Sequence, residues 1–210
     1  AFTRIPVLLG RAARRSINSK GYALLVSNSG AGPTMAEDGK ALFHATHVGP
    51  SSNYNTGSTS LLDATGMKNA KKLMRSMKDV DGSTMNLTPK YLIVPAELEE
   101  TAYTIVNSTH LMGFGGDTAT TMPTVNPNFS KVVPVVEPSL DGATNGTTAW
   151  YLACDQAQCE NIVILSLNGN QTPFLEPITL TDVLGQGWRM YFDVAVAAVN
   201  WRGIVRSKGA

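Results

Sequence analysis

The chain has 210 residues, of which 43% are hydrophobic and 16% are charged, and its formal net charge at pH 7 is +1. This composition excludes a disordered chain and supports one domain, or two small subdomains, with a buried core. No apolar run approaches the roughly 20 residues of a membrane helix, and the first residues lack a signal-peptide pattern, so we expect a soluble, intracellular protein with no membrane partner.

The charges are unevenly distributed along the chain. Residues 1–78 contain 11 Lys and Arg against 3 Asp and Glu, whereas residues 79–210 contain 6 against 13. Such asymmetry is typical of a nucleic-acid face on one half, or of complementary patches that meet in neighbouring copies of one protein. The balanced total argues against a dedicated nucleic-acid-binding module, whose domain would be strongly basic throughout.

The first predicted element is a helix over residues 6–28. Four apolar residues recur on one face at helical spacing: Leu9, Ala13, Ile17 and Leu24. The rest of its surface is basic, and three arginines are candidates for contacts between subunits, because guanidinium groups pair well with carboxylates. These residues are Arg11, Arg14 and Arg15.

Residues 29–60 are rich in Gly, Pro, Ser, Asn and Thr, which predicts loops with one short strand or turn near residues 38–44. A second amphipathic helix is expected over residues 60–79. Its apolar face would consist of Leu62, Ala70, Leu73 and Met77. Its basic stripe would consist of Lys68, Lys71, Lys72, Arg75 and Lys78. This stripe is typical of a surface that neutralises DNA phosphates, of a contact with an acidic subunit surface, or of a solvated face.

A short buried strand is expected over residues 91–94, followed by a helix from Pro95 to about Ser108, with Glu97, Glu99 and Glu100 near its amino end. Residues 113–127 form a Gly- and Thr-rich loop, which is a further candidate contact. After Asn128 the apolar runs predict strands: residues 132–136, 149–154, 162–167, 174–180 and 188–199. The fold class is therefore α+β.

Several segments occur in an order that points to one family. They are residues 4–6 with 9–13, 38–44 with His47, 87–95 with Leu98 and Glu99, 126–129, 149–152 and 193–203. Together they resemble tailed-phage major capsid proteins of the Mu-type major head subunit and prohead protease–capsid fusion family. The resemblance covers nearly the whole chain, although each segment alone is short.

The resemblance implies the Hong Kong 97-type capsid fold. A spine helix and an elongated sheet form the peripheral subdomain in that fold, and a compact α+β unit forms the axial subdomain. We expect residues 1–58 to hold the spine helix and the first part of the peripheral subdomain, residues 59–130 the axial subdomain, and residues 131–210 a β-rich segment that both share. The resemblance also implies an N-terminal arm and an extended loop before the spine helix; we expect neither within these 210 residues, which would then be a fragment or part of a longer subunit.

The function implied by the resemblance is structural. Many copies would assemble through pentamers and hexamers into an icosahedral shell around double-stranded DNA, without catalysis or a cofactor. Scaffold, portal or decoration proteins would be further partners. The location would be the virion, assembled in the bacterial host cytoplasm. The alternatives are an encapsulin-like shell around protein cargo, a monomeric DNA-binding module and a metal-dependent enzyme.

The enzyme alternative depends on His44 and His47, with Asp38 or a cysteine as a further metal ligand. The local sequence lacks the paired ligand clusters of structural zinc sites, so we expect loop histidines that form hydrogen bonds to the backbone. The spacing of Cys154 and Cys159 does not fit a redox Cys-x-x-Cys pair, and we expect both thiols to be reduced, with Cys154 in the core.

Overall fold

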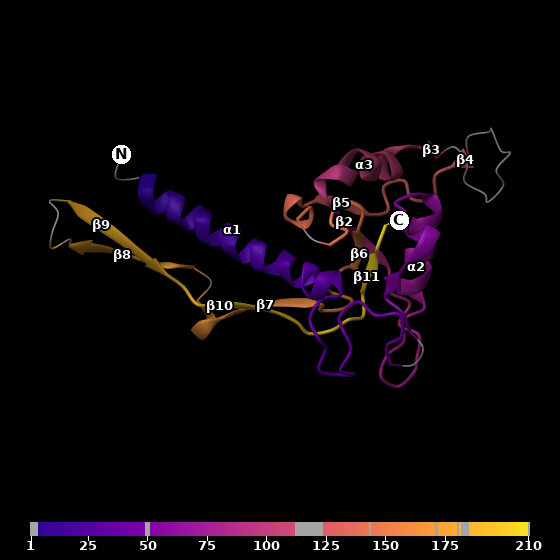
Figure 1. The fold of residues 1–210 in the computed structure, drawn as a ribbon, viewed down its shortest axis with the longest axis horizontal. Helices are drawn as coiled ribbons and strands as arrows, with labels where there is room; N and C mark the ends of the chain where they lie inside the picture. Colours follow the sequence, from indigo (N-terminus) through magenta and orange to yellow (C-terminus); the bar gives the residue numbers. More distant parts are fainter. Residues whose placement is uncertain are drawn as a thin grey trace.

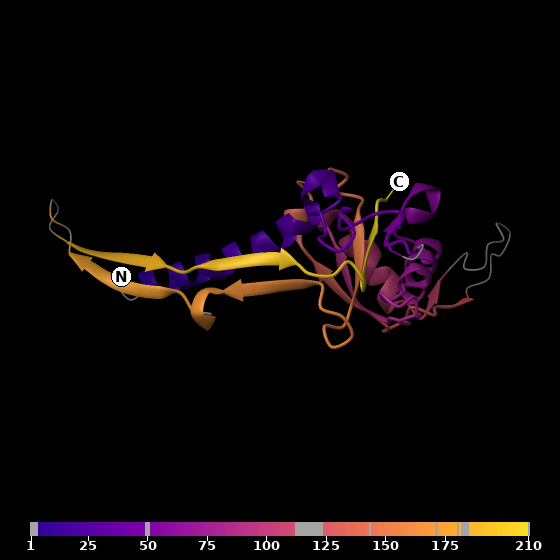
Figure 2. The same cartoon turned by 90° about the horizontal axis from the view of Figure 1, so that it is seen from below.

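The computed structural model describes residues 4–48, 51–111, 124–142, 144–170, 172–179, 181 and 185–209. The chain forms two regions of different shape, one compact and one elongated (Figure 1). We call them the body, which holds the five-stranded sheet and helices α2 (Ala64–Arg75) and α3 (Glu99–Asn107), and the arm. In the arm, helix α1 (Arg4–Val26) lies beside the strands β7 (Ile162–Ser166), β8 (Phe174–Thr179), β9 (Gln186–Tyr191) and β10 (Val194–Ala198). Figure 2 shows that β8 and β9 continue β7 and β10 away from the body.

Helix α1 (Arg4–Val26) confirms the predicted first helix and begins two residues earlier than expected. The predicted apolar face is correct in outline, since Ala13 is buried and Leu9, Ile17 and Leu24 are half-buried. Leu25 is the fully buried residue near its carboxyl end. The helix contacts β10 and the short helix η4 (Pro138–Leu140), and Asn18 donates a hydrogen bond to Glu137 (3.0 Å).

The body is built on a mixed sheet in the order β1-β11-β6-β2-β5. Its strands are β1 (Tyr54–Asn55), β2 (Pro89–Val94), β5 (Val133–Val136), β6 (Trp150–Cys154) and β11 (Ile204–Ser207). The outer pairs β1/β11 and β2/β5 are parallel, whereas β6 runs antiparallel to both of its neighbours. The final strand therefore returns to the centre of the sheet beside β6.

Two helices flank this sheet. Helix α2 (Ala64–Arg75) begins at Asp63, whose carboxylate accepts a hydrogen bond from the Gly66 amide (2.6 Å) and so caps the helix. It is shorter than the predicted span of residues 60–79, because residues 57–60 form the 3-10 helix η2 and Ser76 ends the helix. Helix α3 (Glu99–Asn107) follows the 3-10 turn η3 (Ala96–Leu98), so Pro95 precedes the first turn and does not begin it.

The arm strands are β7 (Ile162–Ser166), β8 (Phe174–Thr179), β9 (Gln186–Tyr191) and β10 (Val194–Ala198). The prediction of one continuous strand over residues 188–199 is wrong. The strand is interrupted at Phe192 and Asp193 because its partner changes: β9 pairs with β8, and β10 pairs with β7. The predicted alternation nevertheless continues through the break, since Met190, Phe192 and Val194 are half-buried while their neighbours are exposed.

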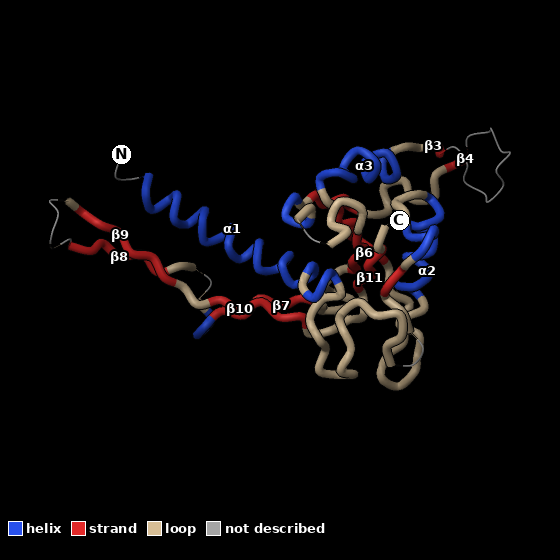
Figure 3. Tube along the Cα trace, viewed as in Figure 1, coloured by secondary structure: helices blue, strands red, loops and turns tan. Residues whose placement is uncertain are grey.

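The predicted strands at residues 91–94, 132–136, 149–154, 162–167 and 174–180 are confirmed within one or two residues, and the α+β class is confirmed with them. Four short strands were not predicted: β1, β3 (His110–Leu111), β4 (Thr124–Val125) and β11. Figure 3 shows the long loops between α1 and α2 at the lower side of the body, as predicted for residues 29–60. Within those loops Thr34 and Ala41 form an isolated bridge.

One hydrophobic core lies in the body. Its largest fully buried side chains are Trp150, Trp201, Tyr151, Leu42, Met67, Met74 and Leu92. They come from the loops, α2 and the central strands, so segments distant in the sequence close one core. Among the described helices, none combines the length and apolar character needed to cross a bilayer.

Candidate interaction surfaces

The arm presents an unusually apolar surface to solvent. Outside α1, six of its large apolar side chains are more than half exposed: Ile164, Leu165, Leu167, Phe174, Tyr191 and Val199. Four of them lie in β7, β8 and β9, Leu167 lies in the 3-10 helix η5 (Leu167–Gly169), and Val199 directly follows β10. The rings of Phe174 and Tyr191 contact each other across the β8–β9 pair, with centroids 5.1 Å apart. Val7 and Leu8 add a similar exposed pair at the amino end of α1. We call the six residues outside α1 the arm apolar surface.

Few secondary-structure elements support the arm apolar surface. Each pair of arm strands forms a separate two-stranded sheet, and α1 is the helix that contacts β9 and β10. A two-stranded sheet is marginally stable by itself in water. Exposed apolar side chains that gather on one element mark sites of protein contact. The arm therefore has the features of a surface that another molecule covers.

The predicted contact arginines lie on this same arm. Arg11, Arg14 and Arg15 are all exposed on α1, and they form no ion pair within the part of the chain that the structure describes. Arg14 also lines a largely apolar cavity of about 560 Å³ between α1 and the strands. Their guanidinium groups are thus available to carboxylates of another molecule.

The predicted basic stripe of the second helix is gathered on α2, with one exception. We call Lys68, Lys71, Lys72 and Arg75 the α2 basic cluster. These four side chains line one pocket with Pro127 and Asn128, opposite the face on which Met67, Ala70 and Met74 are buried. Lys78 lies beyond the end of α2 and pairs by its backbone with Thr84 and Ser51, so it does not belong to the stripe.

Like charges crowd the centre of this cluster. The Lys71 ammonium donates a hydrogen bond to the side-chain oxygen of Asn128. Burial lowers the pKa of Lys71, and the charges of Arg75 and Lys131 lower it further. Arg75 is itself held by a hydrogen bond to Asn86 (2.9 Å). Two of the four cationic side chains are thus held by hydrogen bonds, and among the described residues of the pocket lining none is acidic and offsets the positive charge.

The predicted contact loop over residues 113–127 lies mostly outside the described residues. Its described end, Thr124 and Val125, forms β4 and pairs with β3. Asn126 then donates two hydrogen bonds to the carbonyls of Ile105 and Ser108, each 2.7 Å, at the end of α3. This contact fixes the segment that brings Asn128 to α2.

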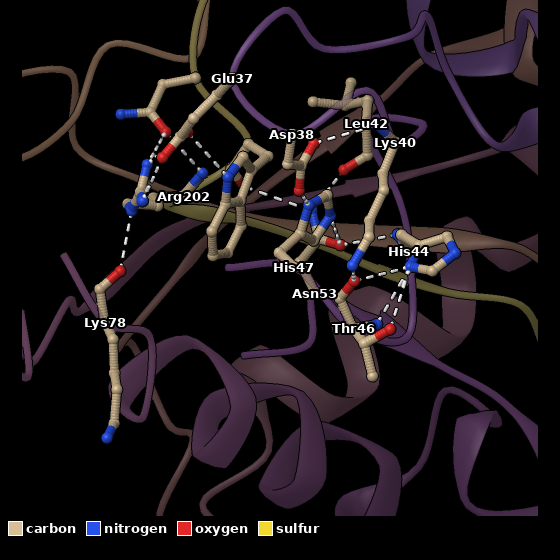
Figure 4. Close-up of polar contacts among 12 residues, drawn as sticks. Glu37, Asp38, Lys40, Leu42, His44, Thr46, His47, Asn53, Lys78 and Arg202 are labelled. Carbon is tan, nitrogen blue, oxygen red and sulfur yellow. Dashed lines mark hydrogen bonds and ion pairs between the residues drawn. The ribbon is translucent and has the colours of Figure 1, made fainter. Parts of the chain in front are cut away.

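The histidines of the enzyme alternative belong to a polar network (Figure 4). His47 is buried, its ring lies parallel to Trp201 with centroids 4.1 Å apart, and its two ring nitrogens face Asp38 (2.7 Å) and the side-chain oxygen of Asn53 (3.2 Å). The amide of Asn53 is oriented by donating to the carbonyls of Leu42 and Trp201. His47 therefore joins the loop to the last turn of the chain.

His44 lies nearby but serves a different contact. Its Nδ1 atom faces the backbone oxygen of Thr46 (2.8 Å), which agrees with the expectation of a loop histidine bonded to backbone. The two imidazole rings meet edge to face with centroids 5.9 Å apart. Within the described ranges, His, Cys, Asp and Glu side chains form no group of three that could hold a metal ion.

An ion pair completes this network. The buried guanidinium of Arg202 donates to both carboxylate oxygens of Glu37 (2.7 and 2.8 Å) and to the carbonyl of Lys78 (2.8 Å). Hydrogen bonds from Arg202 hold the pKa of Glu37 below its usual value. Burial raises the pKa of Asp38, but hydrogen bonds from His47 and Lys40 lower it more, so the net direction is downward. We call Glu37, Asp38, His47, Asn53 and Arg202 the junction network.

Both cysteines are free and buried, as expected for Cys154 in strand β6. Burial and, to a smaller extent, the nearby Cys159 raise the pKa of the Cys154 thiol to about 11. The Cys159 thiol donates to the carbonyl of Arg202 (3.1 Å). A thiol with a raised pKa is a poor nucleophile at neutral pH, so these groups act in packing.

Sequence patterns had not identified Asn53, Asn128 or the Glu37–Arg202 pair. Each joins segments far apart in the chain, and the spacing of residues within one segment does not predict such contacts. The only available signal was the position of Asn128 in the segment 126–129, which contributed to the family resemblance but had no assigned role.

Comparison with known proteins gives two results. A family model described as phage capsid protein matches residues 1–207. A search of the curated proteins finds no match.

Proposed function

The chain belongs to the phage capsid protein family, and on that premise we propose that its copies assemble into an icosahedral shell that encloses double-stranded DNA. Members of such a family are structural, non-enzymatic proteins of the virion, so the earlier resemblance is confirmed at the level of a phage capsid protein. The Mu-type relationship and the Hong Kong 97-type fold remain part of our proposal, as does assembly in the host cytoplasm.

The observation that carries this proposal is the arm. Its two-stranded sheets and the arm apolar surface leave large apolar side chains in solvent, and each buried Å² of apolar surface is worth about 25 cal/mol. Neighbouring copies that pack against the arm would cover these side chains. A contact between different surfaces of identical copies closes into rings when the rotation between copies is suitable.

The other elements and surfaces of the chain would have roles in the same assembly. We assign residues 1–58, which include α1, to the first part of a peripheral subdomain, residues 59–130, which include α2 and α3, to an axial subdomain, and residues 131–210, which include the arm strands and most of the body sheet, to a β-rich segment that both subdomains share. Arg11, Arg14 and Arg15 would pair with carboxylates of a neighbouring subunit. The α2 basic cluster would face packaged DNA or the acidic surface of a neighbour. Portal, scaffold or decoration proteins would join the assembled shell.

Electron microscopy combined with light scattering tests the proposal directly. A 22.4 kDa monomer and a closed particle differ greatly in mass. We expect closed shells or capsomer rings when the chain is produced alone or with its phage partners. A monomer under all salt conditions and with those partners would contradict the proposal. Protein cargo in place of nucleic acid in purified particles would instead identify an encapsulin-like compartment.

Variants of the arm make this test specific. Phe174→Asp and Tyr191→Asp place a carboxylate on the arm apolar surface, and we expect loss of particles with little change in the stability of the monomer, because both side chains are more than half exposed. Val80→Asp is the matched control, since Val80 is 74% exposed on the body. If particles formed equally well in all three variants, the arm would not be part of the contact between subunits.

A further inference from the structure

The pocket beside α2 is lined by a buried amide group without a hydrogen-bond partner for its nitrogen within the described residues, which a solvent-exposed basic stripe would not need. Asn128 is 3% exposed, and its side-chain nitrogen has no hydrogen-bond partner within the described part of the chain. A buried N–H group without a partner costs about 1–3 kcal/mol. Asn128 lines the pocket with all four residues of the α2 basic cluster, so the residue that carries this unpaired donor adjoins four cationic side chains.

The orientation of the Asn128 amide is fixed by its surroundings. The Lys71 ammonium is a donor only, so the atom that it contacts must be the amide oxygen, and the amide nitrogen is the remaining donor. The backbone N–H of Asn128 donates to the side chain of Asn126 (2.9 Å), which is anchored to the end of α3. The pocket therefore contains a positioned neutral donor in addition to flexible charges.

The lining has a consistent chemical character. It contains donors from Lys68, Lys71, Lys72, Arg75 and Asn128, its volume is about 560 Å³, and among the described residues that line it none is Asp or Glu. Lysine, arginine and amide N–H groups are the donors that proteins use for phosphate oxygens. Burial is the main cause of the lowered pKa of Lys71, and the charges of Arg75 and Lys131 add to it; an anion of charge −2 or a phosphodiester would offset these charges.

We propose that the pocket formed by the α2 basic cluster and Asn128 is a binding site for a phosphate group. The inference deepens the proposed contact between α2 and DNA, and it rests on the proposed function only for the source of that phosphate. Two sources share this chemistry, the backbone of enclosed DNA and free inorganic phosphate. The site differs from a sequence-independent basic stripe because it requires Asn128 as well as charge.

Titration of the unassembled full chain with inorganic phosphate, followed by calorimetry and by phosphorus NMR, tests the site. Sodium chloride at matched ionic strength controls for screening. We expect saturable phosphate binding that Lys71→Met and Asn128→Asp each weaken at least about tenfold, because each removes one charge-assisted or positioned donor. Asn128→Asp keeps the oxygen that accepts from Lys71 but adds a negative charge, so Asn128→Leu, which removes the donor without adding a charge, is expected to weaken binding as well; unchanged binding in Asn128→Leu would overturn the role of this donor. Lys20→Gln, on α1 and outside the pocket, is the matched control and should bind as the unchanged chain does.

Three outcomes would overturn the site: equal effects of chloride and phosphate, equal binding by acetate, which would assign the cluster to carboxylates of a second copy, or binding unaffected by Asn128→Asp and Lys71→Met. A short DNA duplex then separates the sources. Competition between duplex and phosphate in the unchanged chain would assign the site to the DNA backbone, whereas phosphate binding without competition would assign it to the free ion. Because no step needs particles, failure of the site and failure of shell assembly are distinguishable.

Discussion

At the scale of single residues, the junction network links the loops before α2 to the last turn of the chain. Arg202 reaches Glu37 and the Lys78 carbonyl, and His47 stacks on Trp201. The sequence placed His47 in a loop and excluded the usual zinc pattern, but it gave no sign of these partners. Glu37 and Arg202 are 165 residues apart, so their pairing depends on the closed sheet.

Removal of the Arg202 guanidinium should destabilise the body. We expect Arg202→Met to lower the free energy of unfolding by about 2–4 kcal/mol, because it leaves the Lys78 carbonyl without this donor and leaves Glu37 with only the Trp201 indole N–H as a side-chain donor among the described residues. The value lies below that of a fully buried pair, since the Glu37 side chain is 33% exposed. Urea unfolding followed by tryptophan fluorescence measures the loss.

Lys90→Met is the matched control for this prediction. Lys90 also pairs with a carboxylate, that of Asp155, but both side chains are well exposed to solvent. Exposed ion pairs contribute little to stability, so this variant should unfold almost as the unchanged chain does. Similar losses in the two variants would show that burial of Arg202 is not what makes its contacts important.

At the scale of elements, the clearest predictions came from periodicity and the clearest error came from pairing. Alternation identified the two-sided character of residues 188–199, and helical spacing identified α1 and α2. Alternation does not reveal which strand lies alongside, so the change of partner between β9 and β10 could not be anticipated. Strand β11 was missed because four residues after a turn carry too short a pattern.

The turn that leads from β10 into β11 depends on Gly203. This residue has φ of +83°, and a Cβ atom added there would lie 2.5 Å from the Cys154 sulfur. We expect Gly203→Ala to cost about 2–4 kcal/mol, from backbone strain together with overpacking against β6. Thermal and urea unfolding would measure the change.

Gly82 provides the control for that substitution. It has φ of +84°, but nothing lies within 4 Å of an added Cβ atom. Gly82→Ala should therefore cost only the backbone term, about 1 kcal/mol. If both variants lost the same stability, contact with Cys154 would not matter and the turn would be limited by its backbone conformation alone.

At the scale of the whole molecule, the junction network makes the free energy of unfolding depend on pH in the acidic range. The pKa values of Glu37 and Asp38 are held below their usual values of 4.5 and 3.8 in the folded chain. The unfolded chain therefore binds more protons in this range, and the stability due to these carboxylates is present above the unfolded pKa values. It is lost as the pH falls through the lower, folded values.

We accordingly expect the free energy of unfolding to change little between pH 7 and about pH 5 on account of these two groups, and to fall below about pH 4.5. Glu37→Gln with Asp38→Asn should flatten the acid limb, whereas Glu100→Gln, an exposed carboxyl on α3, should not. Trp150 and Trp201 are fully buried and report the unfolding by fluorescence. An unchanged acid limb in the double variant would assign the pH dependence to other groups.

The sequence by itself determined the α+β fold class, helices α1 and α2, and most of the longer strands. It also determined that Lys68, Lys71, Lys72 and Arg75 lie on one helical face. These features depend on local spacing, which a single segment carries. Only the tertiary structure decided the strand order, the junction network, the exposed apolar surface of the arm and the place of Asn128 beside α2. Those features are contacts between segments far apart in the chain, and closure of the core around Trp150 and Trp201 brings such segments together.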